Sequence, residues 1–337
     1  MTVVVKLGSS LVTDGAGRIR RSVLSARAAD VAEISEPVCI VSSGAIALGL
    51  PLLGMAQRPR STPQLQAASA AGQVRLQLAW EAAFRAHGLR VAQVLLSAGD
   101  LAERATYLNV RNALNALLKL GAVPVVNEND ATATDEITFG DNDALAAQVA
   151  VLLGARLLVL LTEVEGVYSA SAELLTSGDA VDDASLGPGG AFGRGGMTSK
   201  VTAARLAAAA GIPTVIASGR GPGVVRSIAA GEARGTAFAA ASKQASAFKL
   251  WLRHAKPAAG RLMLDDGARD AILTGGRSLL AVGVAECEGA FEEGDAVELV
   301  AADGTALGKG IAGAGAAELR GRPRGVEAVH RDRLVLY

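Results

Sequence analysis

Six short apolar segments recur along the first two-thirds of the chain, and longer Ala- and Leu-rich segments separate them. The apolar segments are 2–7, 37–43, 90–97, 122–129, 156–163 and 213–218. They are almost continuously apolar, which is typical of parallel strands buried on both faces. The segments 61–88, 106–121 and 199–211 have helical patterns, and the last two end in glycine, a common helix stop. The alternation predicts an α/β fold, a three-layer αβα sandwich on a mostly parallel sheet.

The pattern changes near residue 245. Beyond residue 257, short strand-like runs alternate with Gly-containing turns every 8–12 residues, and one short helix is expected over 267–274. We therefore predict an α/β domain over 1–245, a linker over 246–256 and a small, mostly β, barrel-like domain over 257–337. The polar, glycine-rich segment 177–196 is long for a loop in a compact domain, a length typical of functional or mobile loops.

Composition narrows the class of protein. The chain has 33 Lys and Arg against 33 Asp and Glu, so no global charge attracts nucleic acid or an anionic membrane. The predicted β domain contains nine Lys and Arg, thirteen Asp and Glu and two aromatic residues. Nucleic-acid binding favours clustered positive charge and stacking faces, so RNA binding is disfavoured, although 320–325 is a local basic run.

The first residues, the longest apolar region and the two cysteines all favour a cytoplasmic protein. The first residues lack the charged and apolar regions of a signal peptide. The longest apolar region, 144–162, is interrupted by Gln148, Gly154 and Arg156, and we interpret it as a buried helix followed by a buried strand. Cys39 and Cys287 lie far apart in strand-like runs and are expected to be reduced core thiols. A cytoplasmic protein is predicted.

Polar motifs follow three of the predicted strands. They are Lys6-Leu7-Gly8-Ser9-Ser10, Ser42-Ser43-Gly44-Ala45 and Asn127-Glu128-Asn129-Asp130. The carboxyl ends of parallel strands form the usual ligand edge of an open sheet. Backbone amides at glycine turns, together with a lysine, can bind phosphate. A plain turn after the first strand, a Ser helix cap after the second and an ordinary Asn/Asp turn after the third remain alternatives.

Two further motifs precede helical segments. A lysine in the first helical turn opposes the helix dipole, so Lys200, after the glycine-rich run 193–196, is expected to face an anion; a solvated lysine on a flexible linker is the alternative. In Asp141-Asn142-Asp143 one Asp suffices as an N-cap, contributing about 1 kcal/mol, so the triplet indicates more than capping. Two lysines and several carboxylates at strand ends suit phosphoryl transfer. No metal-ligand set or nucleophile signature is found, and His87, His254 and His330 are scattered.

Together these motifs resemble the glutamate 5-kinases of the amino acid kinase family. The matching stretches are VVVKLGSSLVT, VSSGAIALG, LNVRNALNALLKLGAVPVVNENDA, FGDNDALAAQVA, LLVLLTEVEGVY and GRGGMTSKVTAARLAAAAGIPTVIASG. The tail resembles the PUA domain of many bacterial members. The resemblance implies ATP-dependent phosphorylation of the γ-carboxylate of L-glutamate to L-glutamyl 5-phosphate, the first step of proline biosynthesis. That carboxylate is ionised at neutral pH, so no general base is required.

The resemblance also implies residue roles. Lys6, Asp143 and Lys200 would be catalytic, and our own hypothesis is that Asp143 orients both lysines. The residues expected to bind glutamate are Ser43, Asp130, Asp141 and Asn142. The residues expected to bind ATP are Lys6, Gly8, Ser9, Ser10, Thr162, Glu163, Arg194, Gly195, Gly196, Met197, Thr198, Ser199 and Lys200. Mg²⁺ would accompany ATP, with no predicted protein ligand. A homo-oligomer (dimer or tetramer) and feedback inhibition by proline are expected; a membrane or nucleic-acid partner is not.

Three departures from the family pattern fall on the nucleotide side. Glu163 stands where members commonly have Asp, Arg194 where they have Thr, and no Asp-Pro follows Tyr168. Their effect on nucleotide and magnesium binding is left open. The alternatives are another carboxylate or phosphate kinase of the same fold, such as acetylglutamate kinase, aspartokinase or uridylate kinase; an RNA-binding protein acting through its tail; and an inactive regulatory homologue.

Overall fold

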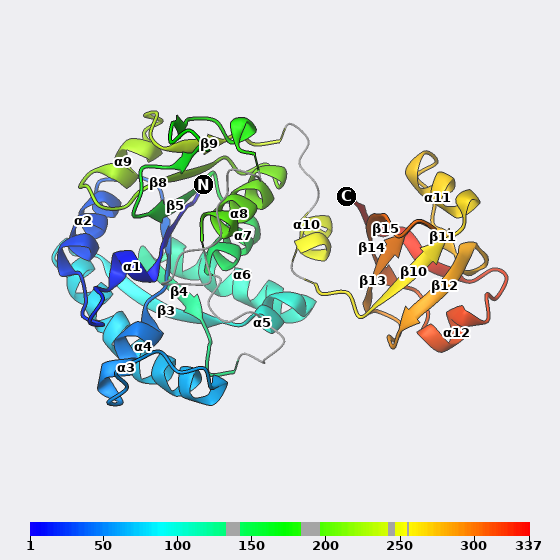
Figure 1. The fold of residues 1–337 in the computed structure, drawn as a ribbon, viewed down its shortest axis with the longest axis horizontal. Helices are drawn as coiled ribbons and strands as arrows, with labels where there is room; N and C mark the ends of the chain where they lie inside the picture. Colours follow the sequence, from blue (N-terminus) through cyan, green and yellow to red (C-terminus); the bar gives the residue numbers. More distant parts are fainter. Residues whose placement is uncertain (133–141, 183–195, 242–246, 255) are drawn as a thin grey trace. The chain divides into compact units, whose positions relative to one another are not determined.

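A seven-stranded sheet forms the centre of the first structural unit, Met1–Gln244 (Figure 1). The computed structural model describes residues 1–132, 142–182, 196–241, 247–254 and 256–337. The strand order is β3-β4-β2-β1-β5-β8-β9, and all neighbours are parallel except β8 and β9. The strands are β1 Val3–Leu7, β2 Val38–Ser42, β3 Arg90–Leu96, β4 Ala122–Glu128, β5 Leu157–Thr162, β8 Thr214–Ser218 and β9 Thr236–Phe238.

The six predicted strands are confirmed, with one correction to their burial. β3 is an edge strand, and most of its residues are exposed or only half-buried, because a neighbour is present on one side only. Its apolar sequence therefore did not indicate burial on both faces. Three strands escaped prediction because two or three residues are too few to show a pattern: β9 and the hairpin of β6 (Val167–Tyr168) and β7 (Leu174–Leu175).

Helices cover both faces of the sheet (Figure 1). The predicted helices 61–88, 106–121 and 199–211 are confirmed, and the last two are followed by Gly121 and Gly211 with φ of 70° and 83°, the left-handed conformation that glycine adopts readily. The helices are α1 Ser9–Val12, α2 Arg21–Ala32, α3 Ala45–Leu52, α4 Thr62–Arg85, α5 Ala98–Ala102, α6 Arg104–Lys119, α7 Asn142–Leu153, α8 Met197–Ala209 and α9 Val224–Ala229, with a 3₁₀ turn at Gly178–Ala180.

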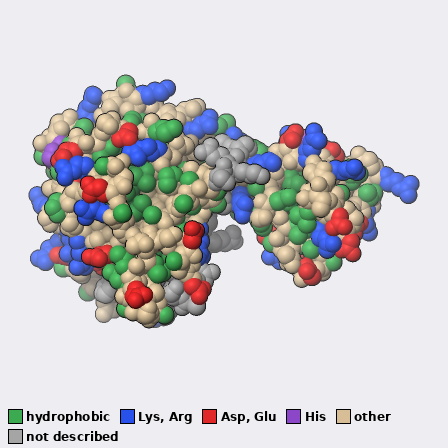
Figure 2. Space-filling view, turned by 90° about the horizontal axis from the view of Figure 1, so that it is seen from above, with side chains coloured by type: hydrophobic (Ala, Val, Ile, Leu, Met, Phe, Trp, Pro, Cys, Tyr) green, Lys and Arg blue, Asp and Glu red, His purple; other side chains and the backbone are tan. Residues whose placement is uncertain are grey.

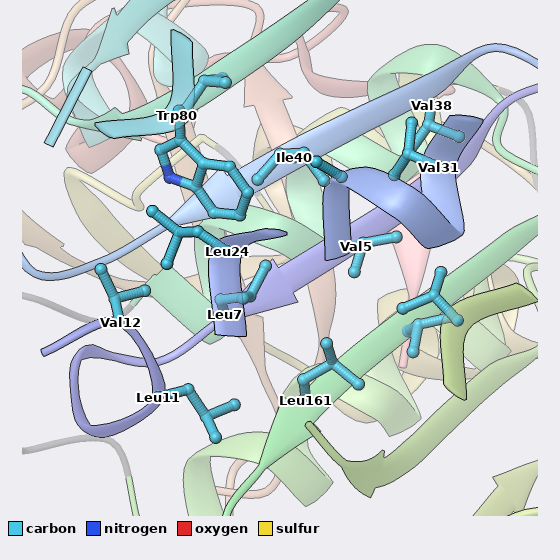
Figure 3. Packing of buried hydrophobic residues seen from close by; sticks show 14 of the residues in the cluster. Val5, Leu7, Leu11, Val12, Leu24, Val31, Val38, Ile40, Trp80 and Leu161 are labelled. Carbon is cyan, nitrogen blue, oxygen red and sulfur yellow. The ribbon is translucent and has the colours of Figure 1, made fainter. Parts of the chain in front are cut away.

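The alternation of side chains along β1 decides which residues reach which layer. Val3, Val5 and Leu7 pack with residues of α2, α4 and α9 in one apolar cluster, and Trp80 of α4 lies beside Leu24 and Ile40 in Figure 3. Successive side chains of a strand point to opposite faces, so Lys6 points to the other layer, where α7 contacts β1 and packs against α8. The apolar region 144–162 forms α7 and β5, as predicted.

The second unit, Ala245–Tyr337, contains a six-stranded sheet of order β11-β15-β14-β13-β10-β12. All neighbouring strands are antiparallel except β10 and β13, and the sheet forms a half-barrel. The helix expected over 267–274 is observed as α11. The elements are α10 Ala247–His254, β10 Gly260–Leu264, α11 Asp266–Leu273, β11 Leu279–Leu280, a 3₁₀ turn Ala281–Gly283, β12 Val284–Gly289, β13 Ala296–Val300, β14 Ala306–Ala312, α12 Ala316–Arg320 and β15 Glu327–Leu336.

Helix α10 lies in the segment 246–256, which the sequence predicts as a linker. The helix contacts β14 and β15, and Trp251 and Leu252 are buried. Lys309 Nζ also donates hydrogen bonds to the carbonyls of Arg253 and Lys256, at 3.3 and 2.9 Å. The strands of this unit therefore cover apolar side chains of α10.

The surface is mixed in charge. On the face that Figure 2 shows, Lys and Arg side chains are interspersed with Asp and Glu side chains over both units. In the described part of the chain, no helix is long and apolar enough to cross a bilayer. Cys39 is buried and Cys287 half-buried, and both are free thiols as predicted.

Candidate active site

A buried cluster of two lysines and one carboxylate lies at the carboxyl edge of the central strands. Asp143 Oδ1 is 2.6 Å from Lys6 Nζ, and Asp143 Oδ2 is 3.0 Å from Lys200 Nζ. All three residues are buried: Lys6 is 4% exposed, Lys200 is 7% exposed and Asp143 is 1% exposed. The predicted contact of one carboxylate with both lysines is therefore present, although the residues are far apart in the sequence.

Three local features produce this cluster. Lys6 is the only charged residue of β1 and points into the layer that contains α7 and α8. Asp143 lies in the first turn of α7, where a carboxylate is favoured by the helix dipole. Lys200 lies in the first turn of α8, where the dipole disfavours a cation, and Asp143 supplies the anion that Lys200 was expected to face.

The electrostatics keep Asp143 ionised. Burial acts to raise the pKa of Asp143, but Lys6 and Lys200 outweigh it and hold that pKa below its ordinary value. Two lysine side chains share one carboxylate here, so cationic groups outnumber anionic ones in a site screened from water. A buried positive charge attracts an anion such as a phosphate group.

Two buried acceptor atoms, on Asp130 and Asn142, have no hydrogen-bond donor among the described residues. Asp130, just after β4, accepts a hydrogen bond on Oδ2 from Ser69 Oγ at 2.5 Å. Among the residues that the structure describes, no hydrogen-bond donor reaches Oδ1 of Asp130 or Oδ1 of Asn142, and both atoms are buried. Burial raises the pKa of Asp130, and Ser69 and Arg58 offset it only in part. Unsatisfied buried acceptors are costly, so they favour a ligand that donates hydrogen bonds.

The motif after β2 lies next to the motif after β1. Ser43 N donates to the carbonyl of Leu7 at 3.0 Å, which places Ser43 beside the Gly8-Ser9-Ser10 turn. The N-cap of α3 is Gly44, with φ of 118°, so a serine cap, the alternative interpretation of this motif, is not observed. The turn after β1 becomes the short helix α1, whose first amide bonds go to the carbonyl of Gly8.

The predicted nucleotide side is assembled around the ends of β5 and β8. Thr162 accepts a hydrogen bond on its carbonyl from Gly219 N at 2.8 Å, and Glu163 pairs with Arg220 at 2.9 Å. The Glu163–Arg220 pair is largely exposed, so it contributes at most about 1 kcal/mol.

Sequence reasoning missed a buried ion pair between Arg27 and Asp30, which bonds to the backbone of the segment after β8. Arg27 Nε is 3.2 Å from Asp30 Oδ2, and the Arg27 guanidinium donates to the carbonyls of Gly219 and Gly221. Asp30 accepts from the amides of Gly223 and Val225 at 2.7 and 3.0 Å. In the sequence, an Arg and an Asp three positions apart on a helix do not indicate such a buried ion pair. Their other partners are backbone atoms almost 200 residues away.

Sequence reasoning also missed three polar side chains of α4. Gln73 Oε1 accepts from Asn127 Nδ2 at 2.8 Å, and Trp80 Nε1 donates to Ser42 Oγ at 2.9 Å, in addition to the bond from Ser69 to Asp130. The available signal was the regular spacing of Ser69, Gln73 and Trp80 on one side of an otherwise apolar helix face.

Several predicted residues are only partly accounted for. Asp141, Arg194 and Gly195 lie outside the described residues. Gly196 is the N-cap of α8, and Met197, Thr198 and Ser199 form its first turn, with Ser199 Oγ 3.5 Å from Asp143 Oδ2. This places the first turn of α8 directly beside the lysine–carboxylate cluster.

The lysine contacts of Asp143 leave neither of its carboxylate oxygens open to a metal ion. Within the described residues, no group of three or more His, Cys, Asp and Glu could hold a metal ion. Asp143 has one lysine on each oxygen, so it is occupied by cations of the protein. Mg²⁺ characteristically keeps several waters and is bound by phosphates with one or two carboxylates.

Comparison with known proteins agrees with this architecture. Residues 1–218 match the model of the amino acid kinase family, and residues 260–331 match that of the PUA domain. A solved isopentenyl phosphate kinase is 22% identical with a TM-score of 0.51, covering 71% of this chain and all of that one, which supports the fold alone. The chain thus belongs to the amino acid kinase family, and carries a C-terminal PUA domain.

Curated relatives narrow the comparison to one branch of the amino acid kinase family, the glutamate 5-kinases. It is 45% identical to the glutamate 5-kinase of Chromobacterium violaceum, over 99% of this chain and 97% of that protein. It is also 45% identical to the glutamate 5-kinase of Myxococcus xanthus, over 99% and 96%, and 42% identical to that of Cupriavidus pinatubonensis, over 99% and 97%. The predicted family and fold class are confirmed.

Proposed function

We propose that the protein transfers the γ-phosphoryl group of ATP to the γ-carboxylate of L-glutamate, giving L-glutamyl 5-phosphate and ADP, the first step of proline biosynthesis. The name of its relatives supports glutamate as the acceptor. The observation that carries the chemistry is the buried Lys6–Asp143–Lys200 cluster, with its net positive charge at the ligand edge of the sheet.

The reaction requires relief of repulsion between two anions. A γ-carboxylate oxygen forms a bond to the γ-phosphorus while the bond from that phosphorus to the β–γ bridging oxygen breaks, and ADP leaves. The attacking carboxylate is already ionised, since a free Glu has a pKa of about 4.3, so no proton has to be removed. Lys6 and Lys200 stabilise charge on the transferred group, and Asp143 holds both ammonium groups in place.

The amino-acid half of the site is assigned to Ser43, Asp130, Asp141 and Asn142. The α-ammonium group of glutamate donates three hydrogen bonds. The Oδ1 atoms of Asp130 and Asn142, which no donor of the described part of the chain reaches, are suited to accept two of them. N-acetylglutamate has an amide in place of that cation. This contrast supports glutamate rather than N-acetylglutamate as the substrate.

The nucleotide half is assigned to the Gly8-Ser9-Ser10 turn, to Thr162 and Glu163, and to the run from Arg194 to Lys200. ATP enters as its magnesium complex, and the ion is a part of the substrate. The phosphates lie where the amino ends of α1 and α8 and the lysine cluster meet, so that both lysines reach the γ-phosphate. Thr162 and Glu163, on the neighbouring strand end, contact the rest of the nucleotide.

A hydroxylamine-trapping assay tests the proposal. With ATP, Mg²⁺ and hydroxylamine, the protein should form a hydroxamate from L-glutamate and at least 10-fold less from N-acetylglutamate or L-aspartate. A hydroxamate formed mainly from N-acetylglutamate would assign the chain to another carboxylate kinase of this fold. Omission of Mg²⁺ should abolish product formation.

Proline inhibition and assembly stay predictions. Proline shares a cationic nitrogen and an α-carboxylate with glutamate, so it would compete for Asp130 and Asn142 and raise the KM for glutamate. A homo-oligomer, dimer or tetramer, would be measured by sedimentation of the full chain. The cytoplasmic location predicted from the sequence stays a prediction as well.

A further inference from the structure

One face of α4 carries three buried polar side chains among apolar ones. Ser69, Gln73 and Trp80 are 4%, 7% and 0% exposed. At about 3.6 residues per turn, spacings of four and seven place all three within an arc of about 40°. We name these three residues the α4 polar stripe.

Each member of the stripe bonds to a strand that carries a proposed glutamate ligand. Ser69 donates to Asp130 just after β4, Gln73 accepts from Asn127 within β4, and Trp80 donates to Ser42, the last residue of β2. The stripe thus links a single helix to the ends of two strands of the sheet.

Helix α4 is itself held at a fixed position. A Cβ added at Gly72 would lie 1.9 Å from the carbonyl oxygen of Ala45, and one added at Gly49 would lie 1.7 Å from that of Ala68. Only glycine permits this approach of α3 and α4. Because α3 begins directly after Ser43 and Gly44, the close packing connects the stripe to Ser43, a second proposed glutamate ligand.

The bond from Ser69 also determines which atom of Asp130 is available. With Oδ2 occupied by the Ser69 hydroxyl, Oδ1 is the atom left without a partner among the described residues. Without this bond the carboxylate could rotate about its terminal torsion, which has broad minima. A carboxylate that must accept from an ammonium group gains affinity when its rotation is already restricted.

We propose that the α4 polar stripe positions the amino-acid half of the site, with Ser69 fixing Asp130, Gln73 fixing Asn127 and Trp80 fixing the Ser42–Ser43 segment. The inference rests on the proposed function, since it assigns these residues to glutamate binding. They are positioning residues: they act through Asp130, Asn127 and Ser43. Nucleotide binding and phosphoryl transfer depend on other elements, so the stripe should control the KM for glutamate selectively.

The test is steady-state kinetics on the full chain with Ser69→Ala. The loss of a hydrogen bond to a carboxylate should raise the KM for glutamate about 10-fold or more, while the KM for ATP and kcat stay within about twofold. Ser69→Thr, which restores the hydroxyl, should recover most of the affinity. The matched control is Ser227→Ala, another buried helical serine, on α9, which should leave all three constants unchanged.

Gln73→Met provides an independent variant if Ser69→Ala does not fold. The same kinetic constants are measured on it. It should raise the KM for glutamate at least threefold without changing the KM for ATP. Equal changes in both KM values, or an unchanged KM for glutamate in a folded variant, would overturn the inference while leaving the proposed function intact. A wild-type chain that does not phosphorylate glutamate would overturn the proposed function, and this inference with it.

Discussion

Replacing Asp143 by Asn tests the lysine–carboxylate cluster most sharply, because the substitution keeps the shape and removes the charge. Both carboxylate oxygens contact a lysine, at 2.6 and 3.0 Å, and the group is 1% exposed. At an effective dielectric constant of about 20, unit charges about 3 Å apart attract by about 5 kcal/mol. Asp143→Asn removes this attraction to both lysines. In the wild type, however, the cost of desolvating the charged groups already offsets much of the attraction.

We therefore expect Asp143→Asn to lower the free energy of unfolding by about 3–5 kcal/mol, the usual cost of removing one partner from a buried ion pair. The turnover number should fall at least 100-fold, since neither lysine keeps its orientation. The control is Glu33→Gln, which removes the same charge from an exposed pair with Arg226 and should cost less than about 1 kcal/mol.

The assay can be confined to the first unit. The chain has two tryptophans, and Trp80 is the one within this unit. In a Trp251→Phe background, urea unfolding followed by fluorescence reports on Trp80 alone, and kcat is measured on the same preparations. An Asp143→Asn protein that loses less than 1 kcal/mol and keeps its turnover within twofold would refute the organising role of Asp143.

Three further outcomes are expected. Lys200→Ala should reduce kcat at least 100-fold in the hydroxamate assay with near wild-type circular dichroism; near wild-type turnover would remove Lys200 from the mechanism. Burial raises the pKa of Asp130 and ammonium binding needs its ionised form, so the KM for glutamate should rise as the pH falls toward that raised pKa. Asp130→Asn should raise the KM at neutral pH and remove this dependence, and a variant that retains the wild-type profile would contradict the assignment. Arg27→Met should lower the free energy of unfolding by about 3 kcal/mol in urea, because it leaves Asp30 buried without its cation, whereas Arg226→Met in the exposed pair should cost under 1 kcal/mol; equal losses would show that Arg27 has no special role.

Much of the first unit could be predicted because its strands are buried and continuously apolar. Those at 2–7, 37–43, 122–129 and 156–163 form the centre of the sheet, where the environment matches the pattern. The edge strand β3 has the same kind of sequence but mostly exposed or half-buried residues, so apolar composition alone does not report position in a sheet. The hairpin of β6 and β7 is set by pairing across a few residues, which leaves no periodic signal.

One part of the candidate site could be predicted because a charged side chain occupies an electrostatically unfavourable position. Lys200, at the positive end of a helix, was expected to face an anion, and Asp143 provides it. Ser69, Gln73 and Trp80 carry no charge, so their signal in the sequence is limited to their regular spacing on one helix face. Their partners become visible only when the fold brings α4 against the ends of β2 and β4.

The most direct test of the proposed function is to follow the oxygen that attacks the phosphorus. L-glutamate labelled with ¹⁸O in its γ-carboxylate is incubated with ATP, Mg²⁺ and the full chain, and the acyl phosphate is cleaved with hydroxylamine, which attacks the carbonyl carbon. Phosphate released in step with the hydroxamate should carry one ¹⁸O atom in its mass spectrum or ³¹P NMR spectrum. Unlabelled phosphate without hydroxamate would show that ATP is hydrolysed and that the γ-carboxylate is not the acceptor.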